Sequence, residues 1–472
     1  MLTYSFEHAG GKPLYEYLYE CIRRDILTGR LRAGEKLPSK RMLARNLGIS
    51  TITVEGAYGQ LTAEGYCQAK ARKGFFVSDV MGQEGRIPPA EQKTARQPEP
   101  EEQHPEHREW LADFAANSVQ PRQFPFASWT RLLRKVVDEE AEALMERSPG
   151  FGVLPLRQAV ADHLWRFRGL SVQPEQIVIG AGTEYLYSLL VQFFGRGKRF
   201  CVENPGYDRI RKIYGINGAD CVLAGMDEHG VKPEELTALG AQILHISPSH
   251  HFPTGIIMPI SRRYELLGWA AAAPDHYIIE DDYDSEFRLT GRPIPTMMGI
   301  DVSSRVIYMN TFSKSLTPTI RISYMVLPAG LVKPFWQKLG FYSCTVSNFE
   351  QYTLARFIRQ GYFEKHINRM RTYYRRKREQ LLSLLREAER AGRLDIIEHG
   401  SGLHFLLRLH IPGSDRAFQQ RLAGFRIRLK PLADYYEGKP EHCRHVFVLN
   451  YSGVSDQTMK PAVRQILACL AE

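Results

Sequence analysis

The chain has 472 residues, 43% of them hydrophobic, and a formal net charge of +10. This length is enough for two or three domains, each with its own core. No apolar run is long enough to cross a bilayer, and the N-terminus lacks the pattern of a signal peptide, so we expect a cytoplasmic protein with no membrane partner. The seven cysteines show no CxxC spacing, which argues against a zinc site and a disulfide framework.

A basic excess marks residues 1–78, which we call the head. The head contains twelve Lys and Arg residues against seven Asp and Glu residues, so about half of the net charge lies in a sixth of the chain. Such a bias favours a polyanionic partner. On charge alone, a basic surface without a partner explains the excess equally well.

Three helices followed by a two-stranded ribbon are predicted in the head. Apolar residues recur at helical spacing over 14–29, and the segments 38–48 and 50–65 each begin with a serine N-cap and end at a glycine. Residues 66–77 are typical of two short strands around a basic turn. This order predicts a winged helix-turn-helix, although a three-helix protein-docking module is the alternative.

In a winged helix-turn-helix, the second helix of the pair enters the major groove of duplex DNA with its N-terminal residues first. We therefore predict that Ser50, Thr51 and Thr53 face the bases. Phosphate contacts orient such a domain without specifying sequence. The residues predicted to make them lie at the start of the preceding helix and at the wing tip: Ser39, Lys40, Arg41, Arg45, Lys70, Arg72 and Lys73.

Residues 79–110 are rich in Pro, Glu and Gln and nearly free of aliphatic side chains. Such a segment cannot bury enough apolar surface to offset the entropy of ordering, so we predict a linker. It separates the head from the body, residues 111–472. Within the body we expect a large subdomain over about 145–335 and a smaller α+β subdomain over about 336–472.

Strand-like apolar runs alternate with helical patterns in the body, which predicts a mostly parallel α/β sheet covered by helices. In such sheets ligands bind beyond the C-terminal ends of the strands. The residues after each run are therefore the candidates for a site. The runs are 176–180, 199–203, 241–247, 276–281 and 306–310.

The first of these strands leads through a glycine turn into a helix. Backbone N–H groups of Gly182 and Thr183 at that helix N-terminus suit a phosphate group, although an ordinary strand–helix turn explains the pattern about as well. A run of acids ends the strand at 276–281, and Asp281 lies where the sheet is still dry. A buried carboxylate needs a cation, and with no histidine at metal-ligand spacing a protonated ring nitrogen is one option.

Two further acids follow that strand, Asp284 and Glu286. They come after the apolar run has ended. We expect them to form a solvated acidic loop.

Lys314 lies in "TFSKSLTPTIR", between apolar flanks. A lysine desolvated in a cleft becomes a nucleophilic amine that can form a Schiff base with an aldehyde. The hydroxyls of Thr311 and Ser313, with Arg321, suit a phosphate dianion. Alone, such a lysine is more often one that snorkels to the surface. Together with the phosphate seat and Asp281, it predicts a pyridoxal 5′-phosphate (PLP) site.

The head resembles the GntR-type winged helix over residues 12–78. The motifs that carry the resemblance are "PSKRMLA", "LGIS", "TV", "LTAEGY" and "GFFV". The family usually has arginine directly after the turn serine, whereas this chain has Thr51. We therefore expect its preferred DNA sequence to differ from the common operators.

The body resembles a fold-type I aminotransferase, and the two parts together resemble a MocR/GabR-type regulator. The motifs are "GAGTE", "ENPGYDRIR", "SPSHHFPTGIIMPISRR", "IIEDDYDSEF" and "TFSKSLTPTIRISYMVLP". The resemblance covers nearly the whole chain and is weakest in the linker and beyond about residue 390. It implies PLP as the cofactor and a head-to-tail homodimer.

The same resemblance implies a role for each matching residue. Lys314 would form the Schiff base, Asp281 would pair with the pyridine nitrogen and Tyr283 would bond the phenolic oxygen. Tyr207 would lie beside the ring, and Arg209 would reach an effector. The phosphate would be held by Gly182, Thr183, Thr311, Ser313 and Arg321.

Two positions depart from the aminotransferase pattern. Phe252 replaces the asparagine that would support the ring oxygen, and His250 or His251 could substitute for it. Asp434 occupies our best placement of the arginine that binds a substrate carboxylate, where it would repel an α-carboxylate and attract an ammonium group. The alternatives for this second position are Arg426 and Arg428.

The resemblance implies a DNA-binding transcriptional regulator that detects an amine-bearing metabolite by aldimine chemistry at Lys314. The effectors it suggests are a GABA-like amino acid, PLP itself, a taurine-like amine or a D-Ala-D-Ala-type dipeptide, and any transamination would be weak. One alternative is a working aminotransferase with an accessory DNA-binding head. Another is a vestigial PLP site.

Overall fold

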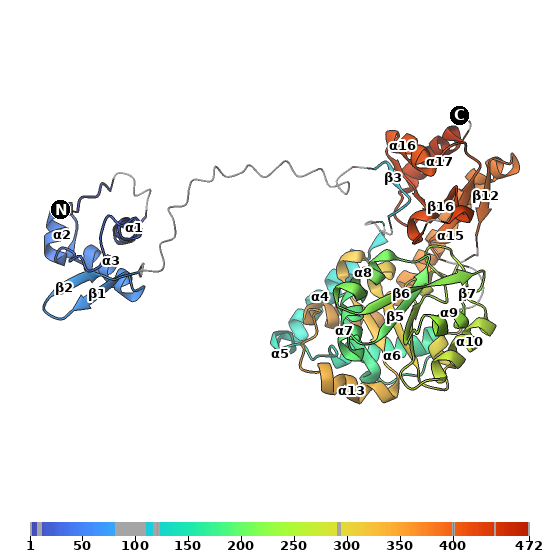
Figure 1. Cartoon of the computed structure of the whole chain (residues 1–472), viewed down its shortest axis with the longest axis horizontal. Helices are drawn as coiled ribbons and strands as arrows, with labels where there is room; N and C mark the ends of the chain where they lie inside the picture. The colour runs from blue at the N-terminus through green and yellow to red at the C-terminus, as the bar shows by residue number, and fades with distance from the viewer. Residues whose placement is uncertain are drawn as a thin grey trace. The chain divides into compact units, whose positions relative to one another are not determined.

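The computed structural model describes residues 2–6, 12–80, 110–116, 120, 123–289, 294–398, 400, 402–438 and 440–470 (Figure 1). One compact unit lies within residues 1–107 and the other within residues 108–472. Most of the predicted linker, residues 81–109, lies outside the described residues. No helix among the described residues is long and apolar enough to cross a membrane.

The head folds as the predicted winged helix. Helices α1 (Leu14–Leu27), α2 (Lys40–Leu47) and α3 (Thr51–Ala63) precede the antiparallel strands β1 (Cys67–Lys70) and β2 (Gly74–Val77). The two predicted serine caps are confirmed, because the Ser39 hydroxyl accepts the Met42 N–H and the Ser50 hydroxyl accepts the Thr53 N–H. The helices enclose a core of buried apolar side chains, which includes Leu18, Ile22, Leu43, Val54, Tyr58 and Leu61.

The body is built on an eight-stranded sheet in the order β4-β11-β10-β9-β8-β5-β6-β7. All five predicted strands are present and run parallel to one another: β4 (Ile177–Gly180), β5 (Arg199–Asn204), β8 (Ile243–Ile246), β9 (Tyr277–Asp281) and β10 (Val306–Thr311). Three strands were not predicted, namely β6 (Asp220–Asp227), β7 (Gly230–Val231) and β11 (Ser323–Val326). Strand β11 runs antiparallel between β4 and β10, which makes the sheet mixed.

Helices cover both faces of this sheet, because successive side chains of each strand point to opposite sides. In β4, Ile177 and Ile179 join the core beneath α6 (Leu154–Arg168) and α14 (Asn348–Arg359), whereas Val178 joins the core beneath α7 (Thr183–Phe194). The other helices of this part are α4 (Phe126–Glu139), α5 (Ala141–Met145), α8 (Asp208–Ile216), α9 (Pro233–Ala238), α10 (Ile260–Ala271), α11 (Met297–Ile300), α12 (Phe312–Ser315) and α13 (Ala329–Leu339).

The 29-residue helix α15 (Tyr362–Arg390) leads into a smaller α+β part, shown in orange and red in Figure 1. Its antiparallel sheet has the order β12-β13-β16-β15, formed by β12 (Leu394–Ile397), β13 (His404–Leu409), β15 (Lys430–Pro431) and β16 (Val446–Asn450). Helices α16 (Asp415–Gly424) and α17 (Asp456–Cys469) pack on it. Strand β3 (Ala112–Asp113) pairs with β14 (Ile427–Arg428), so the start of the body joins its C-terminal part.

Candidate functional site

A pocket opens where β4, β5, β8, β9 and β10 end. It is lined by every residue predicted to contact the cofactor, together with Arg209: Gly182, Thr183, Tyr207, Asp281, Tyr283, Thr311, Ser313, Lys314 and Arg321. These residues come from four segments at or after the ends of β4, β5, β9 and β10, and the segments are far apart in the sequence. Because parallel strands present their C-terminal ends at one edge, the topology itself assembles the site.

Lys314 projects into this pocket from the short helix α12. Burial lowers the pKa of the Lys314 amine to about 8, and the nearby Asp284 carboxylate opposes that shift. A lysine with a lowered pKa has a larger neutral, nucleophilic fraction at physiological pH. Thr311 caps α12 by accepting the Ser313 N–H at 3.1 Å, which fixes the turn that carries the lysine.

The turn after β4 fits closely against a guanidinium group. Gly182 has a φ of +91°, and a Cβ atom there would lie 2.6 Å from the Arg321 Nη2 atom. A side chain at position 182 would therefore displace Arg321. Arg321 also donates to Glu184 at 3.1 Å, and Arg209 lies 3.7 Å from the same carboxylate. The backbone N–H groups that open α7 and a fixed cation thus share one corner of the pocket, as an anion requires.

Asp281 is buried at the opposite side of the pocket. Its Oδ2 atom accepts a 2.6 Å hydrogen bond from Tyr187 and lies 3.4 Å from the His245 Nε2 atom. His245 in turn contacts the Tyr214 hydroxyl at 2.7 Å. The Asp281 Oδ1 atom is buried and has no hydrogen-bond partner among the described residues. This oxygen requires a donor, and a protonated ring nitrogen would supply one.

The predicted solvated loop at Asp284 and Glu286 is wrong, because both side chains are buried. The short helix at Ser285–Phe287 turns the chain inward, Phe287 enters the core, and Arg371 of α15 binds the Glu286 carbonyl oxygen at 2.6 Å. Burial raises the pKa of the Glu286 carboxyl to about 7. Because Phe287 packs into the core, Asp284 and Glu286 beside it are buried although they come after the end of the strand.

Asp284 forms a buried pair with His250. The Asp284 Oδ2 atom lies 2.8 Å from the His250 Nδ1 atom, and the Tyr283 hydroxyl lies 3.3 Å from that same nitrogen. His251 is bonded to the Thr254 hydroxyl at 2.7 Å. His250 is therefore linked to the pocket through Tyr283.

Phe252, and neither of the two histidines before it, is among the described residues that line the pocket. Its ring packs edge-on against Tyr207, with 6.1 Å between the ring centroids. The position that aminotransferases fill with an asparagine therefore contributes an apolar wall. Tyr283 is the hydroxyl donor that remains on this side of the site.

The second departure concerns the C-terminal part of the chain. No residue beyond Arg321 is among the described residues that line the lysine pocket. Asp434 lines an adjoining cavity, which shares Glu203, Gly206 and Tyr207 with the lysine pocket. Arg428 is 49% exposed and lies 3.5 Å from the Asp113 carboxylate.

The pocket residues that were not predicted include Glu184, Tyr187, Glu203 and His245. Glu203 ends β5, accepts the Ser247 N–H at 3.0 Å, and has its pKa raised to about 8 by burial. The signal for His245 was present, since it is a polar residue inside the apolar run at 241–247. Tyr187 lies one turn after Thr183 on α7, where helical spacing brings it to the same face.

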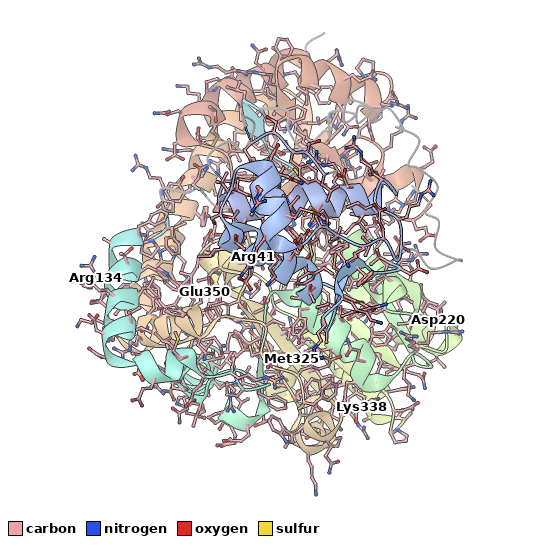
Figure 2. All side chains as sticks on the ribbon, turned by 90° about the vertical axis from the view of Figure 1, so that its left-hand side faces the viewer. Arg41, Arg134, Asp220, Met325, Lys338 and Glu350 are labelled. Carbon is pink, nitrogen blue, oxygen red and sulfur yellow. The ribbon has the colours of Figure 1, made fainter. Side chains whose placement is uncertain are left out.

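In the head, the predicted DNA-contacting residues lie on or next to α2, α3 and the wing. Arg41 and Arg45 are exposed on α2, and Figure 2 labels Arg41 there. Lys40 lies on the same helix and pairs with Glu55 at 2.5 Å. Ser50 and Thr53 share a 2.8 Å hydrogen bond between their hydroxyls, and Thr51 is exposed at the start of α3.

The wing tip is the second basic element of the head. Lys70, Arg72 and Lys73 are exposed on the turn between β1 and β2, where Arg72 has a φ of +58°. The Lys70 ammonium lies 5.0 Å from the Phe76 ring centroid, which keeps its stem along the ribbon.

Two family models match the chain. "Bacterial regulatory proteins, gntR family" matches residues 14–77, and "Aminotransferase class I and II" matches residues 113–466. The "Probable rhizopine catabolism regulatory protein MocR" of Rhizobium meliloti is 30% identical over 96% of this chain and 93% of that protein. The chain belongs to the MocR/GabR-type transcriptional regulators.

Other similarities agree with this family. The HTH-type transcriptional regulator YdeL of Bacillus subtilis is 38% identical over 97% of this chain and 96% of that protein. Among solved structures, the kynurenine aminotransferase of Pyrococcus horikoshii superposes with a TM-score of 0.68 at 24% identity, covering 78% of this chain and 92% of that one. This MocR/GabR-type regulator therefore has a DNA-binding head and a fold-type I aminotransferase body, and its cofactor is PLP.

The described residues of the pocket fit that cofactor. Gly182 lets the Arg321 guanidinium lie close to the start of α7, the Asp281 Oδ1 atom lacks a donor among the described residues, and Lys314 supplies an amine of lowered pKa. Each of these three features matches a different group of PLP: its phosphate, its ring nitrogen and its aldehyde.

Proposed function

We propose that this MocR/GabR-type regulator detects a primary amine that competes with Lys314 for the cofactor. The observation that carries the proposal is the lowered pKa of Lys314 inside a pocket that also contains an anion corner and an unsatisfied carboxylate oxygen. PLP supplies an aldehyde carbon that combines reversibly with primary amines. A metabolite amine that takes the place of Lys314 on the cofactor would leave the lysine with a free amine, which can again carry a positive charge.

Each pocket residue has a proposed role in holding the cofactor. The Arg321 guanidinium and the hydroxyls of Thr183, Thr311 and Ser313 bind the phosphate, and Gly182 allows Arg321 to lie against the turn that opens α7. Asp281 accepts from the ring nitrogen, and Tyr283 donates to the ring oxygen. Tyr207 and Phe252 form the apolar wall beside the ring. The chain thus orients the aldehyde toward Lys314.

The proposed effector is an amine whose distal group interacts with Arg209 or with the cavity at Asp434. No arginine from the C-terminal part is among the described residues of the lysine pocket. This favours an amine that is not bound through an α-carboxylate. Arg209 lines the lysine pocket, and its side chain is 64% exposed to solvent. The amine classes to test are GABA-like amino acids, taurine-like amines and D-Ala-D-Ala-type dipeptides, and PLP itself, which is not an amine, is the alternative effector.

A spectral titration tests this proposal. The holo-protein is mixed with GABA, taurine, D-Ala-D-Ala and PLP in turn, and both the visible band of the lysine-bound cofactor and binding to its own upstream DNA are followed. One amine should change the band and the DNA affinity at the same concentration. Lys314→Ala should abolish both responses, whereas the exposed control Lys333→Ala should keep them.

Two results would contradict the proposal. A band that survives Lys314→Ala would show that this lysine does not hold the cofactor. Sustained release of a keto acid at metabolic rates would favour a working aminotransferase with an accessory head.

We further propose that the head binds duplex DNA. Ser50, Thr51 and Thr53 face the bases, and the residues of α2 and the wing make the predicted phosphate contacts. Support comes from the exposure of Ser50, Thr51, the two arginines of α2 and the basic wing residues, and from the half-buried position of Thr53 and Lys40 on the same elements. We also propose a head-to-tail homodimer, because repeated half-sites need two heads. Large apolar side chains are exposed on the body near α5 and α13, including Met145 at 76% and Phe341 at 69%.

A further inference from the structure

The exposed face of α3 is unusually poor in hydrogen-bond donors. Val54, Ala57, Tyr58 and Leu61 are buried in the head core, which leaves the opposite face exposed. That face contains Thr51, Ile52, Glu55, Gly56 and Gly59. The helix contains no lysine, arginine or asparagine. Its glutamine, Gln60, lies far from the N-terminal turn and donates to the Glu64 carboxylate at 3.1 Å, so the first turn lacks the side chains that most often read guanine and adenine.

The polar groups on this face are already engaged. The Ser50 hydroxyl caps the helix by accepting the Thr53 N–H, and it shares a second hydrogen bond with the Thr53 hydroxyl. The Glu55 carboxylate pairs with the Lys40 ammonium at 2.5 Å. The Thr51 hydroxyl is the polar group that remains available in the first turn.

Ile52 is the largest side chain on this face, and it is 80% exposed. An isoleucine so exposed at the second position of a helix does not contribute to the head core. In the major groove, the feature that an apolar side chain recognises is the C5-methyl group of thymine. Because Ile52 is exposed and lies in the first turn of α3, where few hydrogen-bond donors surround it, it is suited to an apolar contact with a thymine methyl group.

We propose that Ile52 reads the methyl group of a thymine in each half-site of the DNA that this regulator binds. The proposal rests on the DNA contacts proposed above, in which the N-terminal turn of α3 enters the major groove. Basic residues of α2 and the wing position the head, and Ile52 then selects thymine by apolar contact. Thr51 and Ile52 together give a reading surface without an arginine.

The test uses the full-length holo-protein and thymine-to-uracil exchange. Duplexes that the protein enriches from a random-sequence pool are resynthesised with each thymine replaced in turn by uracil, which removes only the methyl group. At one thymine in each half-site, the replacement should weaken wild-type binding about fourfold, the effect of one buried methyl group. At the other thymines the affinity should change little.

Variants of the head assign the effect to a residue. Ile52→Ala should bind the thymine and uracil duplexes equally, and Ile52→Val should keep part of the difference. The control Leu27→Ala removes an exposed apolar side chain from the end of α1, 43% exposed, and should discriminate like the wild type. Because Ile52 is exposed, its variants should unfold at the wild-type temperature.

Three results would overturn the inference. Ile52→Ala could retain the wild-type discrimination, or no thymine could prove sensitive to its methyl group. Ile52→Ala could instead alter the oligomeric state without changing the ratio of the two affinities, which would make Ile52 a protein contact. If no duplex is enriched at all, the proposed DNA contacts fail as well, and that result is distinct from binding without methyl discrimination.

Discussion

At the scale of single residues, the site depends on groups whose protonation is set by burial. Lys314 and Asp281 are separated in the sequence, yet both line one pocket, and each has its own local partner: Asp284 for the lysine and Tyr187 for the aspartate. The Asp284 carboxylate raises the pKa of the Lys314 amine against the effect of burial, and the Tyr187 hydroxyl holds one oxygen of Asp281 by a hydrogen bond. Two predictions follow from these contacts.

The first prediction concerns the pH dependence of cofactor uptake. Only the neutral amine of Lys314 attacks an aldehyde, and burial lowers its pKa to about 8. The rate at which apo-protein develops the visible band after PLP addition should therefore rise through about pH 8 and then level. An exposed lysine would continue to gain reactivity toward pH of about 10.4.

Asp284→Asn gives the matched variant for this measurement. The Asp284 carboxylate raises the pKa of Lys314 against the effect of burial. Removing its charge should move the midpoint of the rate profile to lower pH. A midpoint near that of a free lysine, or a shift to higher pH in the variant, would contradict the assignment.

The second prediction concerns Tyr187→Phe. This change removes a buried 2.6 Å hydrogen bond to the Asp281 carboxylate, and bonds to charged groups contribute about 1.5–3 kcal/mol. Asp281 should then hold the ring nitrogen less firmly, and the dissociation constant for PLP should rise by roughly tenfold or more. Equilibrium dialysis measures this constant. Tyr185→Phe on the same helix is the control, and equal losses in both variants would point to a folding effect.

At the scale of elements, α2, α3 and the wing of the head present different kinds of side chain. Helix α2 and the wing tip supply exposed cations, whereas α3 supplies hydroxyl and apolar side chains. This division separates affinity from specificity, because phosphate contacts act on any sequence.

The third prediction follows from that division. Arg41→Ala and Arg72→Ala should each weaken binding to every DNA sequence and reduce the slope of log affinity against log salt by about one. Fluorescence anisotropy at several salt concentrations measures the slope. Lys12→Ala, whose ammonium pairs with Glu20 at 2.7 Å, is the control. An unchanged slope in the two arginine variants would move the phosphate contacts elsewhere.

At the scale of the whole molecule, regulation requires that an event in the lysine pocket reach the DNA-binding head. A ligand shifts an equilibrium only when it binds one state better than another. A dimer would offer two such states, since the relative position of two heads sets which half-site spacing fits. We propose that association covers the exposed apolar surface near α5 and α13.

The fourth prediction tests that surface. Phe341 is 69% exposed, and its carbonyl lies 3.5 Å from Arg147 of the segment that follows α5. Phe341→Asp should place a charge in the interface, which is costly without a partner, and should shift the protein to monomers in analytical ultracentrifugation. Binding to DNA with two half-sites should weaken in parallel. Val302→Asp, at a side chain 98% exposed, should remain dimeric. A dimeric Phe341→Asp would place the interface elsewhere.

Much of this molecule was predictable because its signals are local. Ser39 and Ser50 mark the starts of two helices because their hydroxyls cap them, and the five predicted strands appear as short runs that are mostly apolar. The order of a glycine turn, an acidic strand end and a lysine among hydroxyls is sufficient to predict a PLP site, because each group is the partner of a different part of the cofactor.

Only the tertiary structure decided the environment of these residues. Asp284 and Glu286 are buried because Phe287 packs into the core, and β11 runs antiparallel because it inserts between β4 and β10. Contacts between residues far apart in the chain produce these outcomes, and a local pattern contains no information about them. The sequence by itself therefore determined which chemical groups are present and the elements that carry them. The packing of distant elements decided which of those groups meet, and which are shielded from water.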